Sequence, residues 1–372
     1  MFCIKSSLAG IYIHVPFCKS KCPYCDFYSV TKDTDLIKKY FDQICCLIKR
    51  YAKNSLQVID TIYFGGGTPS LASPCDIKRV IDCIEENFKV ISPEITVEVN
   101  PADYTESDFK KLKESGVNRI SFGIQSLCDS QLKILCRRHT AKNCVASYFA
   151  AKCAGISNVS FDVIVGVPGQ TCGMLDDFIN FCKINNVSHI SAYMLKIERD
   201  TPFFLNKGGL KFLNDDDMAD MYEYICSKMN GLGYTHYEIS NFAAPGYESR
   251  HNLKYWNLDS YLGLGPGAHS LWDNRRFYYS RNLTEFMCNP QIIHETNFEP
   301  EKEFIMLSLR TASGVDLKKF EYKVGKKFPE KYIKNAKKLV NYGLVELTSS
   351  GFKLPEKSFL VSNSVISRIL DY

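Results

Sequence analysis

The chain has 372 residues, which is enough for one large domain and a smaller one. Hydrophobic residues make up 45% of the chain and charged residues 23%, and the net charge of +5 is too small to indicate a nucleic-acid partner. The sequence has no run of 18 apolar residues and no apolar leader after Met1. We therefore expect a cytoplasmic protein without a membrane span.

The first two-thirds of the chain alternates short apolar runs with longer amphipathic ones. The apolar runs predict strands at 10–15, 58–64, 95–100, 119–123, 159–165 and 189–195. The amphipathic runs predict helices at 36–52, 77–88, 107–115, 141–154 and 174–185. Repeated βα units indicate a parallel sheet, which can be an open doubly wound sheet or a full or partial (β/α) barrel.

The position of the polar residues favours the barrel. A cysteine-rich loop follows the first predicted strand, three glycines follow the second, and polar residues follow or end the others. In a barrel all these strand ends meet at one mouth, where barrel enzymes have their active sites. We therefore predict an α/β fold with a partial (β/α)6-type barrel over residues 1–235.

The rhythm changes after about residue 200. A helix is expected at 215–232, and 234–267 is so rich in aromatic residues and glycines that we expect loops that line the site. We assign 236–299 to a connecting, site-lining segment. Residues 300–372 have the order of helices and two short strands that resembles a winged-helix α+β domain. Its lysine-rich stretch, 316–338, is either a solvated face or a surface that docks to an acidic or membrane-bound acceptor.

Three of the sixteen cysteines have the spacing of metal ligands. Cys18, Cys22 and Cys25 form a CxxxCxxC pattern, and a [4Fe–4S] cluster with only three cysteine ligands keeps one iron open. Zinc bound by the same cysteines and His14 is the alternative, and the pattern alone leaves both open. Many of the other cysteines lie in apolar stretches of the sequence, as buried thiols do, and the rest are isolated from one another. We predict that the isolated Cys3, Cys128, Cys136 and Cys288 are structural.

The remaining strand ends supply groups that can bind a small charged ligand. Gly65, Gly66, Gly67 and Thr68 form a turn that lets the backbone approach a ligand, and no Lys-Ser/Thr follows as in a nucleotide-binding P-loop. Glu98, Gln125, Asp162 and either Arg137 or Arg138 add a polar rim. A carboxylate can hold an amine or ribose hydroxyls, and an arginine can hold a carboxylate.

These motifs together resemble the radical S-adenosylmethionine (SAM) superfamily. They are Tyr12-Ile-His-Val-Pro-Phe-Cys-x3-Cys-x-Tyr-Cys, Gly-Gly-Gly-Thr-Pro, Glu-Val-Asn-Pro, Gly-Ile-Gln-Ser and Asp162-Val-Ile-Val-Gly-Val-Pro-Gly-Gln-Thr. The closer resemblance, over about residues 9–370, is to the branch that contains oxygen-independent coproporphyrinogen III oxidase and the haem chaperone HemW.

The resemblance implies a [4Fe–4S] cluster on Cys18, Cys22 and Cys25 and bound S-adenosylmethionine, cleaved reductively to a 5′-deoxyadenosyl radical. The positions that match the cofactor contacts of the family are Tyr12, Gly66, Gly67, Thr68, Glu98, Gln125, Arg137 and Asp162. Arg137 is preferred to Arg138 on spacing.

Two departures separate the chain from the oxidase. Phe27 stands where the oxidase has a further cysteine, and only 17 residues precede Cys18, where the oxidase has a long arm. The motifs around His251 and His269 look like the haem-chaperone side. The resemblance thus implies a protein that binds haem and delivers it to respiratory haem proteins, with an electron donor and a possible homodimer, near the membrane during delivery.

Three alternatives remain open: coproporphyrinogen III oxidase itself, another radical SAM enzyme with an unknown substrate, and a zinc-binding structural protein. Haem needs an axial ligand and an apolar wall. The candidate ligands are His14, His251 and His269, with Tyr255 and Trp256 as the wall. His189 and His236 are expected to be structural histidines.

Overall fold

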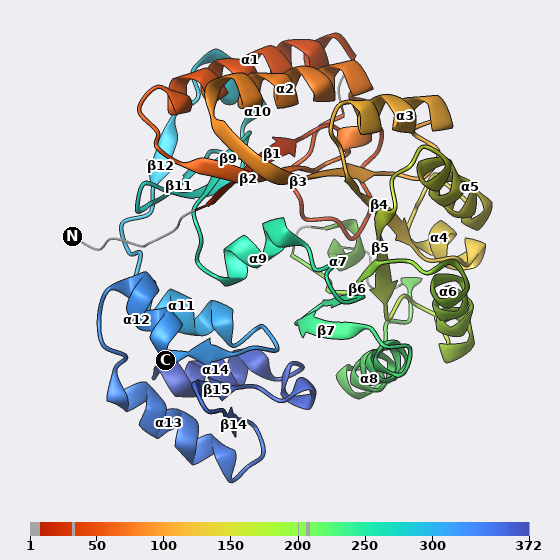
Figure 1. The fold of residues 1–372 in the computed structure, drawn as a ribbon. Coiled ribbons are helices and arrows are strands. Elements are labelled where there is room, and N and C mark those ends of the chain that lie inside the picture. The colour runs from red at the N-terminus through yellow and green to blue at the C-terminus, as the bar shows by residue number, and fades with distance from the viewer. Residues whose placement is uncertain (1–7, 32–33, 200, 206–208, 372) are drawn as a thin grey trace.

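The computed structural model of the protein describes residues 8–31, 34–199, 201–205 and 209–371 (Figure 1). The prediction for Cys3 lies outside the described residues. The main body is built on one twelve-stranded sheet, and a smaller unit with a three-stranded sheet follows at the C-terminus.

Six parallel strands form the centre of the large sheet. They are β1 (Ala9–Val15), β2 (Val58–Gly66), β3 (Lys89–Val99), β4 (Arg119–Gln125), β5 (Asn158–Val165) and β6 (His189–Met194). They lie next to one another in chain order, without the reversal that a doubly wound sheet has at its switch point. Right-handed crossovers in one direction place all connecting helices on one face of the sheet. The predicted partial barrel is therefore confirmed.

Helices cover the outer face of these strands (Figure 1). They are α1 (Thr34–Ala52), α2 (Pro74–Asn87), α3 (Glu106–Glu114), α4 (Asp129–Ile134), α5 (Ala141–Cys153), α6 (Cys172–Asn185) and α8 (Asp215–Gly231), with the short η1 (Pro69–Leu71) and α7 (Pro202–Leu205) in loops. Capping boxes start α3 and α5, where Thr105 pairs with Asp108 and Thr140 with Asn143. None of the helices described is both long and apolar enough to cross a bilayer.

Side chains alternate between the two faces of the parallel strands. Residues that face the helices are apolar, such as Ile62, Val97 and Phe161, and they belong to one large core. The registered neighbours on the other face are polar, and one row across the sheet joins Glu98, Ser121 and Ser160. A parallel strand that is buried on both faces is usually apolar throughout. The polar inner face is therefore a feature of the barrel interior, not of the packing of the helices.

The segment after α8 contains more regular structure than expected. Its strands are β7 (Thr235–Glu238), β8 (Asn241–Ala243), β9 (Tyr261–Leu264), β10 (His269–Trp272), β11 (Arg275–Tyr279) and β12 (Ile292–His294), and its helices are α9 (Arg250–Trp256) and α10 (Leu283–Cys288). The prediction of loops over 234–267 was wrong. Strands of three to five residues have no clear period, and they form here because β9 pairs with β1 and β8 pairs with β6.

The C-terminal unit has the predicted helices and two short strands, and one further short strand, β13 (Val315–Asp316), that was not predicted. It consists of α11 (Pro300–Ser308), β13 (Val315–Asp316), α12 (Leu317–Val324), α13 (Glu330–Val340), β14 (Glu346–Leu347), β15 (Gly351–Lys353), η3 (Glu356–Ser358) and α14 (Ser362–Leu370). Its own core contains Phe304, Phe320 and Phe352 and continues into Leu258 and Leu271 of the preceding segment. The division of the chain at residues 235 and 299 stays a prediction.

Candidate functional site

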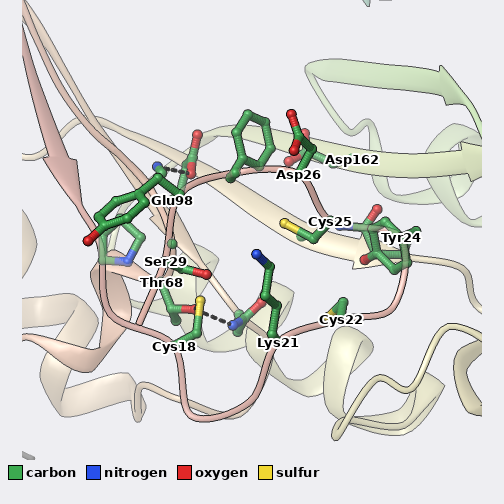
Figure 2. Close-up of a pocket in the computed structure, with 18 of the residues that line it drawn as sticks. Cys18, Lys21, Cys22, Tyr24, Cys25, Asp26, Ser29, Thr68, Glu98 and Asp162 are labelled. Carbon is green, nitrogen blue, oxygen red and sulfur yellow. Dashed lines mark hydrogen bonds between the residues drawn. The ribbon is translucent and has the colours of Figure 1, made fainter. Parts of the chain in front are cut away.

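A cavity of about 1030 Å³ opens at the carboxyl ends of the parallel strands. Cys18, Cys22 and Cys25 lie on the loop that lines one side of it, with Thr68, Glu98 and Asp162 around the loop (Figure 2). All eight predicted cofactor-contacting residues and all three predicted cluster ligands line this cavity. Residues from five different strand ends thus meet in one place, as the barrel interpretation requires.

Backbone hydrogen bonds hold the cysteine loop at its base. The amide of Cys18 donates to the Val30 carbonyl at 3.0 Å, and the Val30 amide donates to the Pro16 carbonyl at 2.7 Å. These bonds join the two ends of the loop directly after β1, while the segment between them lines the cavity.

The three thiols have an environment that fits a cluster. Thr68 Oγ1 lies 3.5 Å from Cys18 Sγ, and Arg137 Nη1 lies 3.5 Å from Cys22 Sγ, so each of these sulfur atoms has a donor. Burial, followed by the charges of Cys22 and Cys18 among the remaining causes, raises the pKa of Cys25. If all three thiolates bound at one centre, they would repel one another unless a cation or cluster lay between them. The donor set is three sulfur atoms, which fits a [4Fe–4S] cluster with one open iron.

His14 lies beside this site but is already engaged. Its Nε2 lies 2.9 Å from the Tyr28 carbonyl, which can only accept, so Nε2 carries the proton. Its Nδ1 then accepts a hydrogen bond of 3.0 Å from the Tyr12 hydroxyl. Burial lowers the pKa of His14 to about 4, which keeps the ring neutral. A zinc ion bound by His14 would require the hydrogen bond at the binding nitrogen to break.

The glycine turn after β2 exists because other chain segments approach it closely. Gly66 has φ +109°, and a Cβ there would lie 2.4 Å from His14 Nδ1. A Cβ on Gly67 would lie 2.7 Å from the Val15 carbonyl oxygen, to which the Gly67 amide donates. Only glycine fits at either position. The turn thereby places Thr68 against the cysteine loop.

Glu98 and Asp162 bring two carboxylates into the interior. Glu98 accepts hydrogen bonds from the Tyr63 hydroxyl at 2.8 Å and the Gly66 amide at 3.1 Å, and Asp162 accepts one from Ser121 Oγ at 3.1 Å. Burial, with a smaller contribution from Asp162, raises the pKa of Glu98 to about 7. Burial likewise raises the pKa of Asp162. A cationic ligand in the cavity would favour the charged form of both.

The structure separates the two arginine candidates. Arg137 Nη2 donates to Asn100 Oδ1 at 2.5 Å and to the Gly123 carbonyl at 2.7 Å, so its guanidinium is fixed inside the cavity. Arg138 is exposed and forms a 3.4 Å ion pair with Asp103 on the rim. Arg137 thus has the position that suits contact with a bound carboxylate.

The backbone of Gln125 is unusual for its residue type. It has φ +63°, although it is not glycine, and it ends β4 at the cavity. A side chain in this region of φ is costly and persists where the surrounding structure imposes it, often at functional sites.

Some residues that line the cavity, or that bind a lining residue from behind as Tyr63 does, escaped the sequence-based selection. Asn100 and Tyr63 each bind a predicted site residue, and Tyr24 lies 3.5 Å from Arg137 Nη1. Asn100 could have been found, because it follows Glu98 by two positions and so shares its face of the strand. Tyr63 likewise lies two positions from Gly65 and so shares its face of β2. Tyr24 lies within the cysteine motif, but no periodicity applies to such a loop.

The three candidate haem ligands differ in accessibility. His251 is buried, with Nδ1 2.8 Å from Thr61 Oγ1 and Nε2 2.8 Å from the Tyr255 hydroxyl. His269 lines the cavity, its side chain is 53% exposed, and its Nδ1 lies 3.1 Å from Glu295 Oε1. Among the described residues, His269 Nε2 has no hydrogen-bond partner. His269 is therefore the candidate that can accept a ligand without breaking an internal contact.

The other predictions for histidines and aromatic residues have separate outcomes. His189 is fully buried between Ser160 Oγ at 2.7 Å and the Tyr237 hydroxyl at 2.8 Å, which agrees with a structural role. Tyr255 lines the cavity, whereas Trp256 is not among the lining residues. Phe27 lines the cavity too and is 67% exposed.

Comparison with known proteins gives matches along almost the whole chain. A profile of the Radical SAM superfamily matches residues 12–182, and a profile of the HemN C-terminal domain matches residues 299–361. The heme chaperone HemW of Bacillus subtilis (strain 168) is 35% identical over 376 residues, covering 98% of this chain and 99% of that protein. The heme chaperone HemW of Lactococcus lactis subsp. lactis (strain IL1403) is 34% identical over 371 residues, with 96% of each chain covered.

Among solved structures, coproporphyrinogen III oxidase (HemN) from Escherichia coli is similar with a TM-score of 0.83 and 18% identity, covering 98% of this chain and 90% of that chain. That likeness concerns the fold. The sequence motifs, the geometry of the cavity and the full-length similarity agree with one another. The chain belongs to the radical SAM superfamily and, within it, to the family of the HemW proteins.

Proposed function

We propose that this protein is a haem chaperone that binds haem at the cavity and delivers it to haem-dependent respiratory enzymes. The observation that carries the proposal is the similarity to proteins named heme chaperone HemW over 96–98% of the chain. We further propose that the protein acts in the cytoplasm, close to the membrane during delivery, with an electron donor and as a possible homodimer.

Cys18, Cys22 and Cys25 would hold a [4Fe–4S] cluster, which together with S-adenosylmethionine supplies one-electron chemistry when bound. The chain's own part is to orient that cofactor. Arg137 places a positive charge inside the cavity for a carboxylate, and Glu98 and Asp162 offer oxygens to hydroxyls or an amine.

Haem is proposed to lie at the mouth of the same cavity. The cavity volume of about 1030 Å³ is at the upper end of the roughly 300–1,000 Å³ usual for ligand sites. A cavity of this size supports the proposal that it holds more than one ligand. His269 Nε2 would bind the haem iron, and Glu295 would orient the ring through Nδ1, as carboxylates commonly do for metal-binding histidines. Phe27 and Met194 supply exposed apolar surface, and Arg281 lines the same cavity as a partner for the haem carboxylates.

An absorption titration tests the proposal. Haem is added anaerobically to the cluster-loaded protein, and the same is done with His14→Ala, His251→Ala and His269→Ala. We expect saturable binding by the wild type and a loss of at least tenfold in affinity for His269→Ala, with a shifted Soret band. His251→Ala should mainly lower stability, by about 1–3 kcal/mol, because two buried partners lose their hydrogen bonds. If the intact protein does not bind haem, the proposal fails.

The alternative function is that of oxygen-independent coproporphyrinogen III oxidase, which shares the fold. It is tested by incubation of the loaded protein with coproporphyrinogen III, S-adenosylmethionine and a reductant. We expect no vinyl-bearing product above background. Multiple turnovers would make the protein an enzyme of porphyrin synthesis and contradict the chaperone proposal.

A further inference from the structure

A second group of potential metal ligands lies outside the cavity, where the barrel meets the C-terminal unit. Cys226 is on α8, His236 is on β7 and Glu356 is on η3. Their sulfur, nitrogen and oxygen donor atoms all lie within 4.8 Å of one another. Figure 1 shows α8 and β7 in green next to the blue C-terminal unit. None of the three residues lines the cavity described above.

The ring of His236 is held in one orientation. Its side chain is only 3% exposed, it stacks on Phe242 at 4.2 Å between centroids, and the Phe359 ring packs against it at a right angle, 5.1 Å between centroids. Its Nδ1 lies 2.7 Å from Glu356 Oε1, and its Nε2 lies 3.4 Å from the Tyr222 hydroxyl. Both nitrogen atoms therefore have a fixed neighbour.

These two neighbours place conflicting demands on a neutral ring. The Tyr222 hydroxyl donates its one proton to the Ile239 carbonyl at 2.5 Å, and a carbonyl cannot donate. The Tyr222 oxygen can consequently only accept from His236 Nε2. With the proton on Nε2, the bare lone pair of Nδ1 faces a carboxylate oxygen, and these two acceptors need a further proton or a metal ion to bridge them.

A second proton on the ring would be one such cation, but a buried imidazolium is costly. A metal ion is the other. A proton shared by His236 and Glu356 would account for those two side chains, but only a metal ion would also use the nearby thiol of Cys226. We propose that Cys226, His236 and Glu356 bind a zinc ion that joins the barrel to the C-terminal unit.

The set of donors is the reason to choose zinc. Zinc takes thiolate, imidazole and carboxylate ligands together in a tetrahedral arrangement, and thiolate ligands disfavour magnesium and calcium. A water molecule fills the fourth position from the side of Glu356, whose side chain is 41% exposed. Binding releases the thiol proton of Cys226 to solvent and involves no redox step.

The surroundings also supply outer contacts for such a site. Tyr222, Cys226 and Asn230 are four residues apart on α8 and so lie on one face of the helix. The Tyr222 oxygen accepts from His236 Nε2, and the amide of Asn230 lies 2.9 Å from both oxygens of Glu356. Metal-binding side chains are commonly oriented by outer hydrogen bonds of this kind.

The test uses the full chain with its cluster reconstituted under anaerobic conditions, so that Cys18, Cys22 and Cys25 are occupied. Two equivalents of zinc sulfate are added, the excess is removed, and zinc and iron are counted per chain. We expect one zinc ion per chain, and X-ray absorption at the zinc edge should show a single sulfur neighbour at about 2.3 Å. Cys226→Ala should lower the zinc content at least tenfold and leave the iron content unchanged.

Matched controls are Cys46→Ala, an exposed cysteine on α1, and Glu346→Gln, an exposed carboxylate in the same C-terminal unit. Both should keep wild-type zinc content. Glu356→Gln removes an exposed group and so preserves the fold, but it should weaken zinc binding at least tenfold. Zinc should also raise the unfolding midpoint of the wild type and not that of Cys226→Ala or Glu356→Gln.

The proposal is overturned if the loaded protein takes up no zinc, if Cys226→Ala and Glu356→Gln keep the wild-type zinc content, or if the zinc has three sulfur neighbours. None of these measurements involves haem, so the result is independent of the chaperone proposal.

Discussion

The inner wall of the cavity and its mouth are built in different ways. On the inner wall, Glu98 accepts two hydrogen bonds from neighbouring segments and Arg137 donates two to such segments. At the mouth, Phe27 is 67% exposed and the side chain of His269 is 53% exposed. A wall with fixed side chains suits a resident cofactor, because little ordering is needed on binding. Side chains with free surface suit a ligand that must also leave.

The largest effect should come from the cysteine loop. Changing Cys18, Cys22 and Cys25 to alanine removes every thiolate of the proposed cluster site, so the iron content should fall from about four per chain to near zero. Iron analysis and the absorption spectrum near 400 nm measure this. Cys136→Ala is the control, because Cys136 lines the same cavity but lies outside the motif. Colourless wild-type protein with zinc and no iron would contradict the cluster.

The next effect concerns Glu98→Gln, which should weaken ligand binding but stabilise the folded protein at pH 8. Glu98→Gln removes a charge from the inner wall, and we expect S-adenosylmethionine to bind roughly 10- to 100-fold more weakly, as is typical when a charged hydrogen bond of about 1.5–3 kcal/mol is lost. Isothermal titration at pH 8 measures the affinity. Glu106→Gln, an exposed residue of α3, should have no effect.

The same residue gives a pH dependence. The pKa of Glu98 is about 7 in the folded chain against an ordinary value of 4.5, so the folded chain binds a proton that the unfolded chain has released between these values. Its contribution to the free energy of unfolding therefore decreases as the pH rises from 4.5 to 7. Glu98→Gln should remove this loss and stabilise the protein at pH 8 by about 1–3 kcal/mol. Chemical denaturation at pH 5 and pH 8 measures it, and an equal change at both pH values would argue against the raised pKa.

The third comparison separates neighbouring arginines of the inner wall and the rim. Arg137→Lys loses the guanidinium hydrogen bonds to Asn100 and Gly123 that fix the charge inside the cavity, and should weaken S-adenosylmethionine binding about tenfold. Arg138→Lys keeps a charge that pairs with Asp103 at the surface and should change the affinity less than twofold. Equal effects of the two substitutions would mean that the inner position of Arg137 is not used.

The smallest effect is expected at the mouth. Phe27→Ala should leave the free energy of unfolding within about 0.5 kcal/mol of the wild type, because the ring is mostly exposed. Haem affinity should fall a few-fold through the loss of apolar contact. A haem titration and a urea titration on the same samples separate the two quantities. A large loss of stability would show that Phe27 packs within the protein and not against a ligand.

Much of the barrel was predictable because its signals are local. The strands around Val15, Phe64 and Val163 are apolar runs between helices, and such strands can be recognised from the local sequence alone. The segment around Tyr261 was not predictable in this way. Its strands are too short to have a period, and β9 forms only because β1 offers an edge more than 240 residues earlier in the chain.

The same distinction applies to the site. Cys18, Cys22 and Cys25 are close in the chain, so their convergence follows from the length of the loop, and the strand-end positions of Glu98 and Asp162 follow from the βα rhythm. Other features depend on contacts between distant segments. They are the hydrogen bonds that fix the Arg137 guanidinium, the engagement of both nitrogen atoms of His251 and the contact of His236 with Glu356. Motifs and periodicity depend only on residues that are close in the sequence. Whether a side chain still has a donor or acceptor available for a ligand depends on its partners from the rest of the fold.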